Sequence, residues 1–277
     1  MNPVLPLFLR PGPEQRFALY HAPAGPACRG AVLYVHPFGD EMNKSRRMAA
    51  LQARRLAGLG YAVLQLDLHG CGDSAGAFED ARWADWKDDV ATGCAWLAEQ
   101  VAAPLTIWGL RLGALLALDY AASASAAPAH LVLWQPVRQG ALFLQQWLRL
   151  LTANVMLTQG SGSGAAAAAR AALVAGETLD VAGYRLTPAL ADALNALDAA
   201  TLVPVGASVH WLETAGVAGR ALAPDLQRVC AAWRDAGVDL HLHQVPCAPF
   251  WASQEITECP ALLDATTTIF DGLSHAH

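Results

Sequence analysis

The chain has 277 residues and a formal net charge of −6, with 54% hydrophobic and 15% charged residues. This balance is typical of a globular protein with a large apolar core and excludes a disordered chain. A net negative charge without clustered lysine and arginine argues against nucleic acid as a partner. No stretch offers about 18 unbroken apolar residues, so we expect no integral membrane segment. The first residues also lack the features of a signal peptide, and we expect a cytoplasmic protein.

The first elements expected are two short strands, followed by alternating strands and helices. Residues 5–9 and 16–21 flank a Pro-Gly-Pro turn, which predicts an antiparallel hairpin. Apolar runs of strand length then lie at 31–35, 61–66 and 105–108, and helical patterns follow them at 45–59, 82–99 and from 112 onward. Near-continuous apolar strands that alternate with helices indicate a parallel sheet covered on both faces.

The second half of the chain supplies the remaining strands and an insertion. Further strands are expected at 130–134, 208–212 and 238–245, and helices at 225–235 and 255–270. Between about 138 and 205 the alternation gives way to helical and low-complexity sequence. We interpret this stretch as a lid inserted into one domain that spans residues 1–277, placed over the carboxyl ends of the strands.

The cysteines and histidines give no sign of a metal site. Six cysteines are spread along the chain without a Cys-x-x-Cys pair, so we expect free thiols and no zinc site. His241 and His243 alternate on one face of the last strand, but no third ligand has matching spacing. A polar strand face is the favoured interpretation, and nothing in the sequence indicates a cofactor.

The most informative motif lies at 109–113, where Gly-Leu-Arg-Leu-Gly follows a strand and precedes a helix. Two glycines around a tight strand-to-helix turn form the frame of a nucleophile elbow, whose attacking residue is a serine. This chain carries Arg111 in that position. A guanidinium stays protonated and has donors but no lone pair with which to attack a carbonyl. The motif therefore predicts a scaffold more firmly than a reaction.

Together these features resemble the α/β-hydrolase family across essentially the whole chain. Residues 36–39 (His-Pro-Phe-Gly) are similar to the family's oxyanion loop, and residues 67–76 to its Gly-x-Gly-x-Ser turn. A narrower similarity, over residues 41–48, 109–113, 133–136 and 249–251, is to bacterial proteins associated with exopolysaccharide production and a protein-sorting (exosortase) system. The resemblance implies an α/β-hydrolase fold with an N-terminal antiparallel hairpin and a helical lid. It also makes an export-machinery protein a candidate partner.

This sequence matches the family's catalytic triad at only one of its three positions. Arg111 stands at the nucleophile position, and Glu213, after a late strand, fits the position of the acid. The loop after the last strand, which should carry the base, contains no histidine over residues 246–251. The resemblance implies a hydrolase, but two of the three triad roles are missing, so enzymatic activity stays open.

The elbow still predicts an anion site. A helix that begins near Leu112 directs free N–H groups and the positive end of its dipole toward the former active site. Arg111 and the backbone donors near Phe38 and Leu112 could together hold the carboxylate or phosphate of a small anionic or acyl substrate. The alternative is a buried ion pair between Arg111 and Glu213.

Five other residues are candidates for the same cleft. His36 lies beside the oxyanion loop and is a candidate base or substrate contact, with a structural histidine as the competing interpretation. Glu41 and Lys44 belong to a charged run that is either a solvated helix start or a source of ligand contacts. Trp134 and Trp251 follow strand ends and either line the pocket or pack in the core.

Three functions remain open from the sequence. The first is hydrolysis of an ester or thioester by water that Glu213 or His36 activates while Arg111 holds the substrate. The second is binding of an acyl or sugar-phosphate ligand without chemistry. The third is a structural role beside the export machinery, with the pocket filled internally. The fold cannot choose among them.

Overall fold

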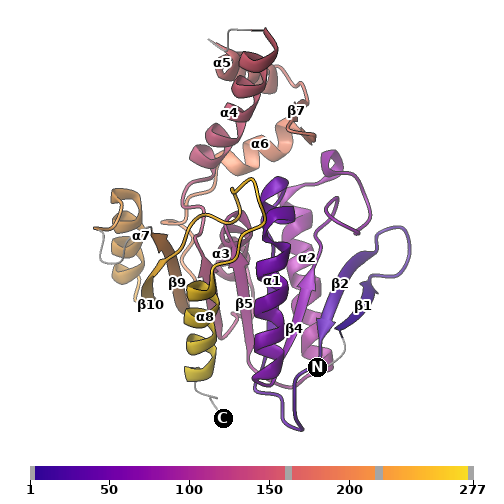
Figure 1. Ribbon diagram of the computed structural model, residues 1–277, viewed down its shortest axis with the longest axis vertical. Coiled ribbons are helices and arrows are strands. Elements are labelled where there is room, and N and C mark those ends of the chain that lie inside the picture. Colours follow the sequence, from indigo (N-terminus) through magenta and orange to yellow (C-terminus); the bar gives the residue numbers. More distant parts are fainter. Residues whose placement is uncertain (1–3, 160–163, 216–220, 274–277) are drawn as a thin grey trace.

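A computed structural model describes residues 4–159, 164–215 and 221–273, and its main feature is an eight-stranded sheet. The strand order is β1-β2-β4-β3-β5-β6-β9-β10. β1 (Val4–Leu9) and β2 (Arg16–His21) form an antiparallel hairpin, and β2 pairs antiparallel with β4 (Tyr61–Leu66). The other six strands of this sheet, β4, β3, β5, β6, β9 and β10, run parallel to one another (Figure 1). This is the α/β-hydrolase fold that the sequence predicts.

The parallel strands are short and mostly buried. Besides β4 they are β3 (Gly30–Val35), β5 (Leu105–Leu110), β6 (His130–Trp134), β9 (Ser208–Ala215) and β10 (Asp239–Pro246). The central ones carry apolar residues on both faces because helices cover both sides of the sheet. Every predicted strand is present, and β9 runs three residues further than predicted, so that Glu213 lies within it.

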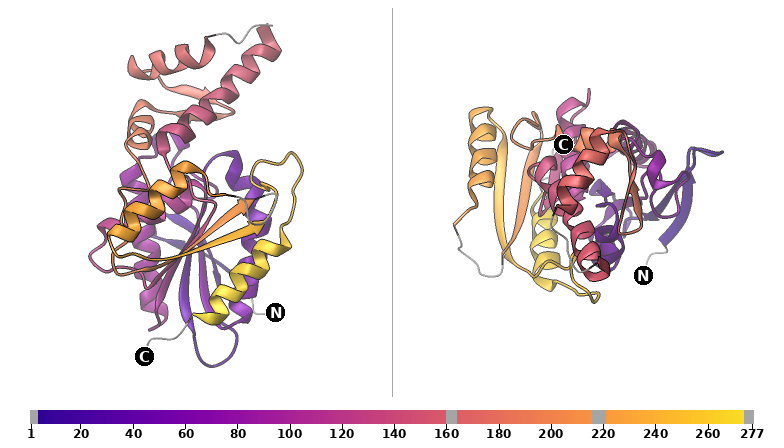
Figure 2. Two further views of the ribbon diagram at one scale, coloured as in Figure 1. Left: turned by 90° about the vertical axis from the view of Figure 1, so that its left-hand side faces the viewer. Right: turned by 90° about the horizontal axis from the view of Figure 1, so that it is seen from above.

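Helices pack on the two faces and create two apolar cores. α1 (Asp40–Gly58) and α8 (Pro260–Gly272) cover one face, over a core that includes Trp108 and Trp134. α2 (Trp83–Gln100), α3 (Leu112–Ser123) and α7 (Pro224–Asp235) cover the other, over a core that includes Trp86. Figure 2 shows α7 and α8 on opposite sides of the strands. None of the described helices combines the length and the hydropathy needed to span a membrane.

Two helices, α1 and α8, begin five residues away from the predicted start. α1 starts at Asp40 rather than at residue 45, so that Glu41 and Lys44 lie in its first turns. The negative charges of Asp40 and Glu41 interact favourably with the positive end of the helix dipole. α8 starts at Pro260 rather than at residue 255. Proline lacks an N–H and suits the first turn of a helix, but it holds the preceding Cys259 out of helical geometry.

The segment between β6 and β9 stands above the carboxyl ends of the parallel strands (Figures 1 and 2). It contains α4 (Gly140–Gln159), α5 (Ala165–Val174), a hairpin of β7 (Leu179–Val181) and β8 (Tyr184–Leu186), and α6 (Pro188–Asn195). The sequence does not predict the hairpin, whose turn residues Ala182 and Gly183 have φ of 55° and 86°. Tyr184 ties the segment to α1, because its hydroxyl accepts a hydrogen bond from Asn43 at 3.2 Å.

Cys247 and Cys259 form a disulfide across the loop between β10 and α8, with their Cα atoms 5.9 Å apart. The prediction that all thiols are free is therefore wrong for this pair. The two cysteines are 12 positions apart and belong to no motif, so only the return of the chain from β10 to α8 brings them together. The free cysteines among the described residues are Cys28, Cys71, Cys94 and Cys230.

The second glycine of the elbow packs against β3 and gives a test of the fold. A Cβ atom added at Gly113 would lie 2.3 Å from the carbonyl oxygen of Val35 and 2.4 Å from that of His36. Backbone atoms cannot move aside easily, so we expect Gly113→Ala to lower the free energy of unfolding by about 1–3 kcal/mol in urea denaturation.

Gly58→Ala is the matched control, because Gly58 lies in α1 with nothing within 4 Å of the added atom. It should be neutral or should raise stability by up to about 1 kcal/mol through helix propensity. Equal destabilisation by the two substitutions would contradict the close-contact argument.

Candidate functional site

Arg111 occupies the elbow between β5 and α3. Its backbone has φ 54° and ψ −117°, a conformation that is rare for residues with a side chain and is typical of strained functional turns. A Cβ atom at Gly109 would lie 2.5 Å from the Cα atom of Ala114, so the tight turn requires glycine there. The chain therefore keeps the backbone geometry of a nucleophile elbow with an arginine at its apex.

The guanidinium of Arg111 lies between an acid and an aromatic ring. Its Nε is 3.3 Å from Oε1 of Glu41 on α1. Its central carbon is 5.3 Å from the ring centroid of Trp251, within cation–π range. The side chains of Arg111 and Glu41 are 16% and 22% exposed, so the pair remains accessible from solvent. The sequence predicted Glu41 only as a candidate ligand contact and not as the partner of Arg111.

Glu41 is incompletely paired. Its Oε2 atom is buried and has no hydrogen-bond partner among the described residues. Burial raises the pKa of Glu41 above its ordinary value, although the nearby Arg111 acts in the opposite direction. Leaving a buried acceptor without a donor costs free energy. A proton on Glu41 would therefore stabilise the site by removing the charge from this unpaired oxygen.

Glu213 belongs to a separate network. Its Oε1 accepts hydrogen bonds from Arg138 at 2.8 Å and from the amide of Gln135 at 3.1 Å, and its Oε2 accepts one from the indole of Trp211 at 2.9 Å. Arg138 also pairs with Asp225 at 2.6 Å. The alternative of an Arg111–Glu213 ion pair is thus wrong, because Arg138 takes this carboxylate. Sequence spacing gave no sign of that pairing.

His36 is bonded on both ring nitrogens and is 4% exposed. Nε2 accepts a hydrogen bond from the Leu68 N–H at 3.1 Å, and Nδ1–H donates to the Pro37 carbonyl at 2.5 Å. Burial lowers the pKa of His36, which keeps the ring neutral. The histidine fastens the end of β3 to the end of β4, and in this geometry neither nitrogen can take a proton from a substrate.

No other nucleophile replaces the missing serine in the adjoining turn. The hydroxyl of Ser74 donates to the Asp67 carbonyl and accepts from the Phe17 N–H at 2.9 Å. Cys71 is buried, and burial raises the pKa of its thiol. Both side chains hold the turn after β4 in place.

A pocket of about 240 Å³ opens over Arg111 and Glu41. Its other lining residues include Phe38, Asp40, Lys44, Phe143, Gln146, Trp147 and Trp251. Lys44 pairs with Asp40 at 2.7 Å on the rim. Among the described residues, no acceptor bonds to the backbone N–H of Phe38 or of Leu112. Phe38 lines this pocket, whereas Leu112 is buried and lines a separate small cavity together with His36, Phe38 and Trp86. The pocket thus combines cationic donors, the backbone donor of Phe38 and aromatic walls.

Trp134 does not line this pocket. Its side chain is fully buried beneath α8, where its indole N–H donates to the hydroxyl of Thr266 at 2.8 Å. Side chains alternate along a strand, and Trp134 lies on the face toward α1 and α8. The prediction that it lines the pocket is wrong, while Trp251 does line it. The aromatic residues that sequence reasoning missed, Phe143 and Trp147, come from α4.

A histidine cluster lies on β9 and β10, away from the pocket. The ring of His210 stacks on that of His241 at 4.7 Å, and its Nδ1 is 3.2 Å from Nε2 of His243. Burial and the neighbouring imidazoles lower the pKa of His210 from 6.5 to about 4. No group of three or more His, Cys, Asp or Glu is arranged to hold a metal ion within the described part of the chain.

This cluster predicts a loss of stability in acid. The unfolded chain protonates His210 near its ordinary pKa, whereas the folded chain does so only near about 4, so unfolding takes up protons as the pH falls between these values. We expect His210→Gln to make the decline in unfolding free energy between about pH 7 and 5 shallower, as measured by urea denaturation at each pH. Parallel curves for the variant and the wild type would refute this origin of the acid sensitivity.

Comparisons with known proteins agree with this fold. A family model described as serine aminopeptidase, S33, matches residues 26–173, more than half of the chain. No curated protein sequence matches. Similar solved structures include Est1E from Butyrivibrio proteoclasticus with ferulic acid bound (15% identity, TM-score 0.62, covering 95% of this chain and 96% of that one). They also include a carboxyl esterase from Bacillus coagulans in complex with glycerol (14%, 0.63, 99% of each chain).

A proline iminopeptidase from Mycobacterium smegmatis is similar at 13% identity and a TM-score of 0.61, with 96% of this chain and 98% of that one covered. At such low identities the solved structures show the fold alone. The family model adds a match in sequence over β3 to α5, which includes the elbow. The chain therefore belongs to the serine aminopeptidase S33 family of α/β-hydrolases.

Proposed function

We propose that this chain is a ligand-binding member of its family, which holds a small anionic acyl compound in the pocket over Arg111. The single observation that carries the proposal is the arginine at the apex of an intact elbow. It places a permanent cation where a serine would attack. The loop after β10 brings Trp251 to the site and no imidazole, so a base is also missing.

One end of the pocket presents hydrogen-bond donors for a charged group, and the other end presents aromatic side chains for a hydrocarbon chain. Among the described residues, Arg111 donates only to Glu41 and only through Nε, so its remaining N–H groups are available to a carboxylate or phosphate. The N–H group of Phe38, where an active relative would hold an oxyanion, adds a donor nearby. The rings of Phe143 and Trp147 lie 5.5 Å and 5.0 Å from that of Phe38 and suit an acyl chain.

Hydrolysis by activated water is the second candidate, and the state of Glu41 favours it. A carboxylate with a raised pKa and an unpaired oxygen suits a general base. The Glu41 carboxylate would take a proton from water, the water oxygen would attack an ester or thioester carbonyl, and the leaving oxygen or sulfur would then receive that proton. Glu213 and His36, the bases considered from the sequence, are less suited because each is already fully bonded.

The similarity to exosortase-associated proteins suggests a setting for either candidate. The ligand would then be an acyl or sugar-phosphate compound of exopolysaccharide production in the cytoplasm, with an export-machinery protein as the partner. This part of the proposal rests on the sequence resemblance alone.

Binding of an anionic acyl compound can be tested with hexanoate. Hexanoate should raise the melting temperature of the wild type with concentration, because it binds only the folded state, and uncharged 1-hexanol should raise it less. Arg111→Met keeps an unbranched apolar side chain and removes the charge, so it should weaken hexanoate binding about tenfold or more. The matched control Arg234→Met, at an exposed position on α7, should behave as the wild type. Equal shifts in the two variants would sink the proposal.

The two candidates separate in an assay of short and long acyl esters and thioesters. If the pocket only binds, the wild type, Arg111→Met and Glu41→Gln, prepared identically, should show the same background rate. Turnover that is lost in Glu41→Gln would favour activated water instead.

Restoring the serine should not restore the enzyme. Arg111→Ser supplies the nucleophile, but no free histidine among the described residues is placed to activate it, so we expect turnover of the same esters to stay within about tenfold of background. Efficient turnover by Arg111→Ser would show that a base is already present in the pocket.

A further inference from the structure

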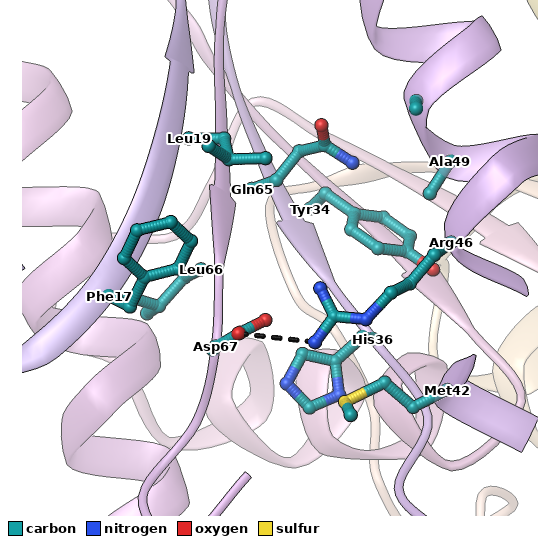
Figure 3. A pocket seen from close by; sticks show the side chains of 11 residues that line it. Phe17, Leu19, Tyr34, His36, Met42, Arg46, Ala49, Gln65, Leu66 and Asp67 are labelled. Carbon is teal, nitrogen blue, oxygen red and sulfur yellow. Dashed lines mark hydrogen bonds and ion pairs between the residues drawn. The ribbon is translucent and has the colours of Figure 1, made fainter. Parts of the chain in front are cut away.

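A second cavity, of about 170 Å³, lies between α1 and the sheet (Figure 3). Its floor consists of two rows of side chains that cross β2, β4 and β3. One row is Leu19, Gln65 and Tyr34, and the next is Phe17, Asp67 and His36. α1 forms the roof with Met42, Arg46, Ala49 and Ala50. The cavity exists because the helix presents two alanines to this part of the floor.

This cavity is separate from the pocket over Arg111. The two share no lining residue, because they lie on different sides of α1. Glu41 and Lys44 face the Arg111 pocket, whereas Met42 and Arg46 face the second cavity. A ligand in the second cavity would therefore contact the same helix without entering the elbow.

The polar groups around the cavity have unused hydrogen-bonding capacity. Oδ2 of Asp67 accepts from Arg46 at 3.3 Å and from the Asp73 N–H at 3.0 Å, while no described residue donates to Oδ1. The carbonyl oxygen of Gln65 bonds with His21 at 2.8 Å, and the NH₂ group of Gln65 has no partner within the described part of the chain. The hydroxyl of Tyr34, whose side chain is 5% exposed, has no partner among the described residues.

The charges in the cavity cancel. Arg46 and Asp67 form one ion pair, with side chains that are 44% and 10% exposed. An added carboxylate would be repelled by Asp67, and an added ammonium by Arg46. The site thus favours an uncharged ligand that accepts a hydrogen bond on the Arg46 and Gln65 side and donates one to Asp67.

The size and the walls of the cavity restrict the ligand further. An apolar cavity of roughly 150 Å³ holds a benzene molecule. Here Phe17, Leu19 and Met42 supply apolar side chains, and Figure 3 shows Arg46 and Asp67 directed toward each other. We propose that this cavity binds a small uncharged aromatic or heteroaromatic amide, with its ring among the apolar side chains and its carbonyl and N–H groups on Arg46 and Asp67.

Benzamide is the probe, and the methyl signal of Met42 is the readout. Carbon-13 labelling of methionine methyl groups gives four signals, of which Met42→Leu identifies one. Benzamide should shift the Met42 signal and bind about fivefold more tightly than acetophenone, which lacks the donor, or benzoate, which carries a charge. Benzoate binding as tightly as benzamide would overturn the ligand class, and an unshifted Met42 signal would overturn the site.

Substitutions locate the binding. Ala50→Leu fills the cavity from the roof and should abolish the shift, and Arg46→Gln should weaken binding about fivefold. Arg47→Gln is the matched control, because Arg47 lies on the same helix and pairs with Glu258 outside the cavity. It should bind as the wild type does.

Arg111→Met separates this proposal from the one for the elbow, since it should leave benzamide binding unchanged. Loss of binding in Arg111→Met together with retention in Arg46→Gln would assign benzamide to the other pocket and overturn the inference. If Ala50→Leu does not fold, the exposed Arg46 position still provides the test.

Discussion

The guanidinium of Arg111, at the apex of the elbow, determines which side chains can pack around it. The tight turn forces its backbone to positive φ, and the glycines at 109 and 113 let that turn approach α3 and β3. A permanent cation held there at low exposure needs partners, which Glu41 of α1 and the ring of Trp251 provide. Three segments far apart in the sequence therefore meet at one charge.

Because Arg111 pairs with Glu41, the other polar residues considered for catalysis have other partners. Glu213 is held by Arg138, which also binds Asp225 on α7 and so joins α7 to the start of the inserted segment. His36 fastens β3 to β4 instead of acting on a substrate. Glu213 and His36, the two bases considered from the sequence, thus have structural partners here, and the pocket keeps its donors and its aromatic walls.

α1 connects the two cavities of the molecule. Its first turns contribute Glu41 and Lys44 to one and Met42 and Arg46 to the other. Tyr184 of the inserted hairpin contacts the same turns through Asn43. The loop with Trp251 is closed by the Cys247–Cys259 disulfide, which limits how far this wall of the Arg111 pocket can move. A shift of α1 would therefore change the shape of both cavities and the contact of the helix with the inserted segment.

The sequence by itself determined the sheet, the hairpin, the elbow, the arginine at its apex and the absence of histidine from residues 246–251, because these depend on local periodicity, glycine spacing and residue identity. Only the tertiary structure decided which acid meets Arg111. From the sequence, Glu213 was the candidate partner and Glu41 only a candidate ligand contact, and nothing in their spacing reports that α1 begins at Asp40 or that Arg138 reaches Glu213. The side on which Trp134 packs and the pairing of Cys247 with Cys259 were likewise hidden. They depend on how strands and helices far apart in the chain pack together, which a local pattern does not encode.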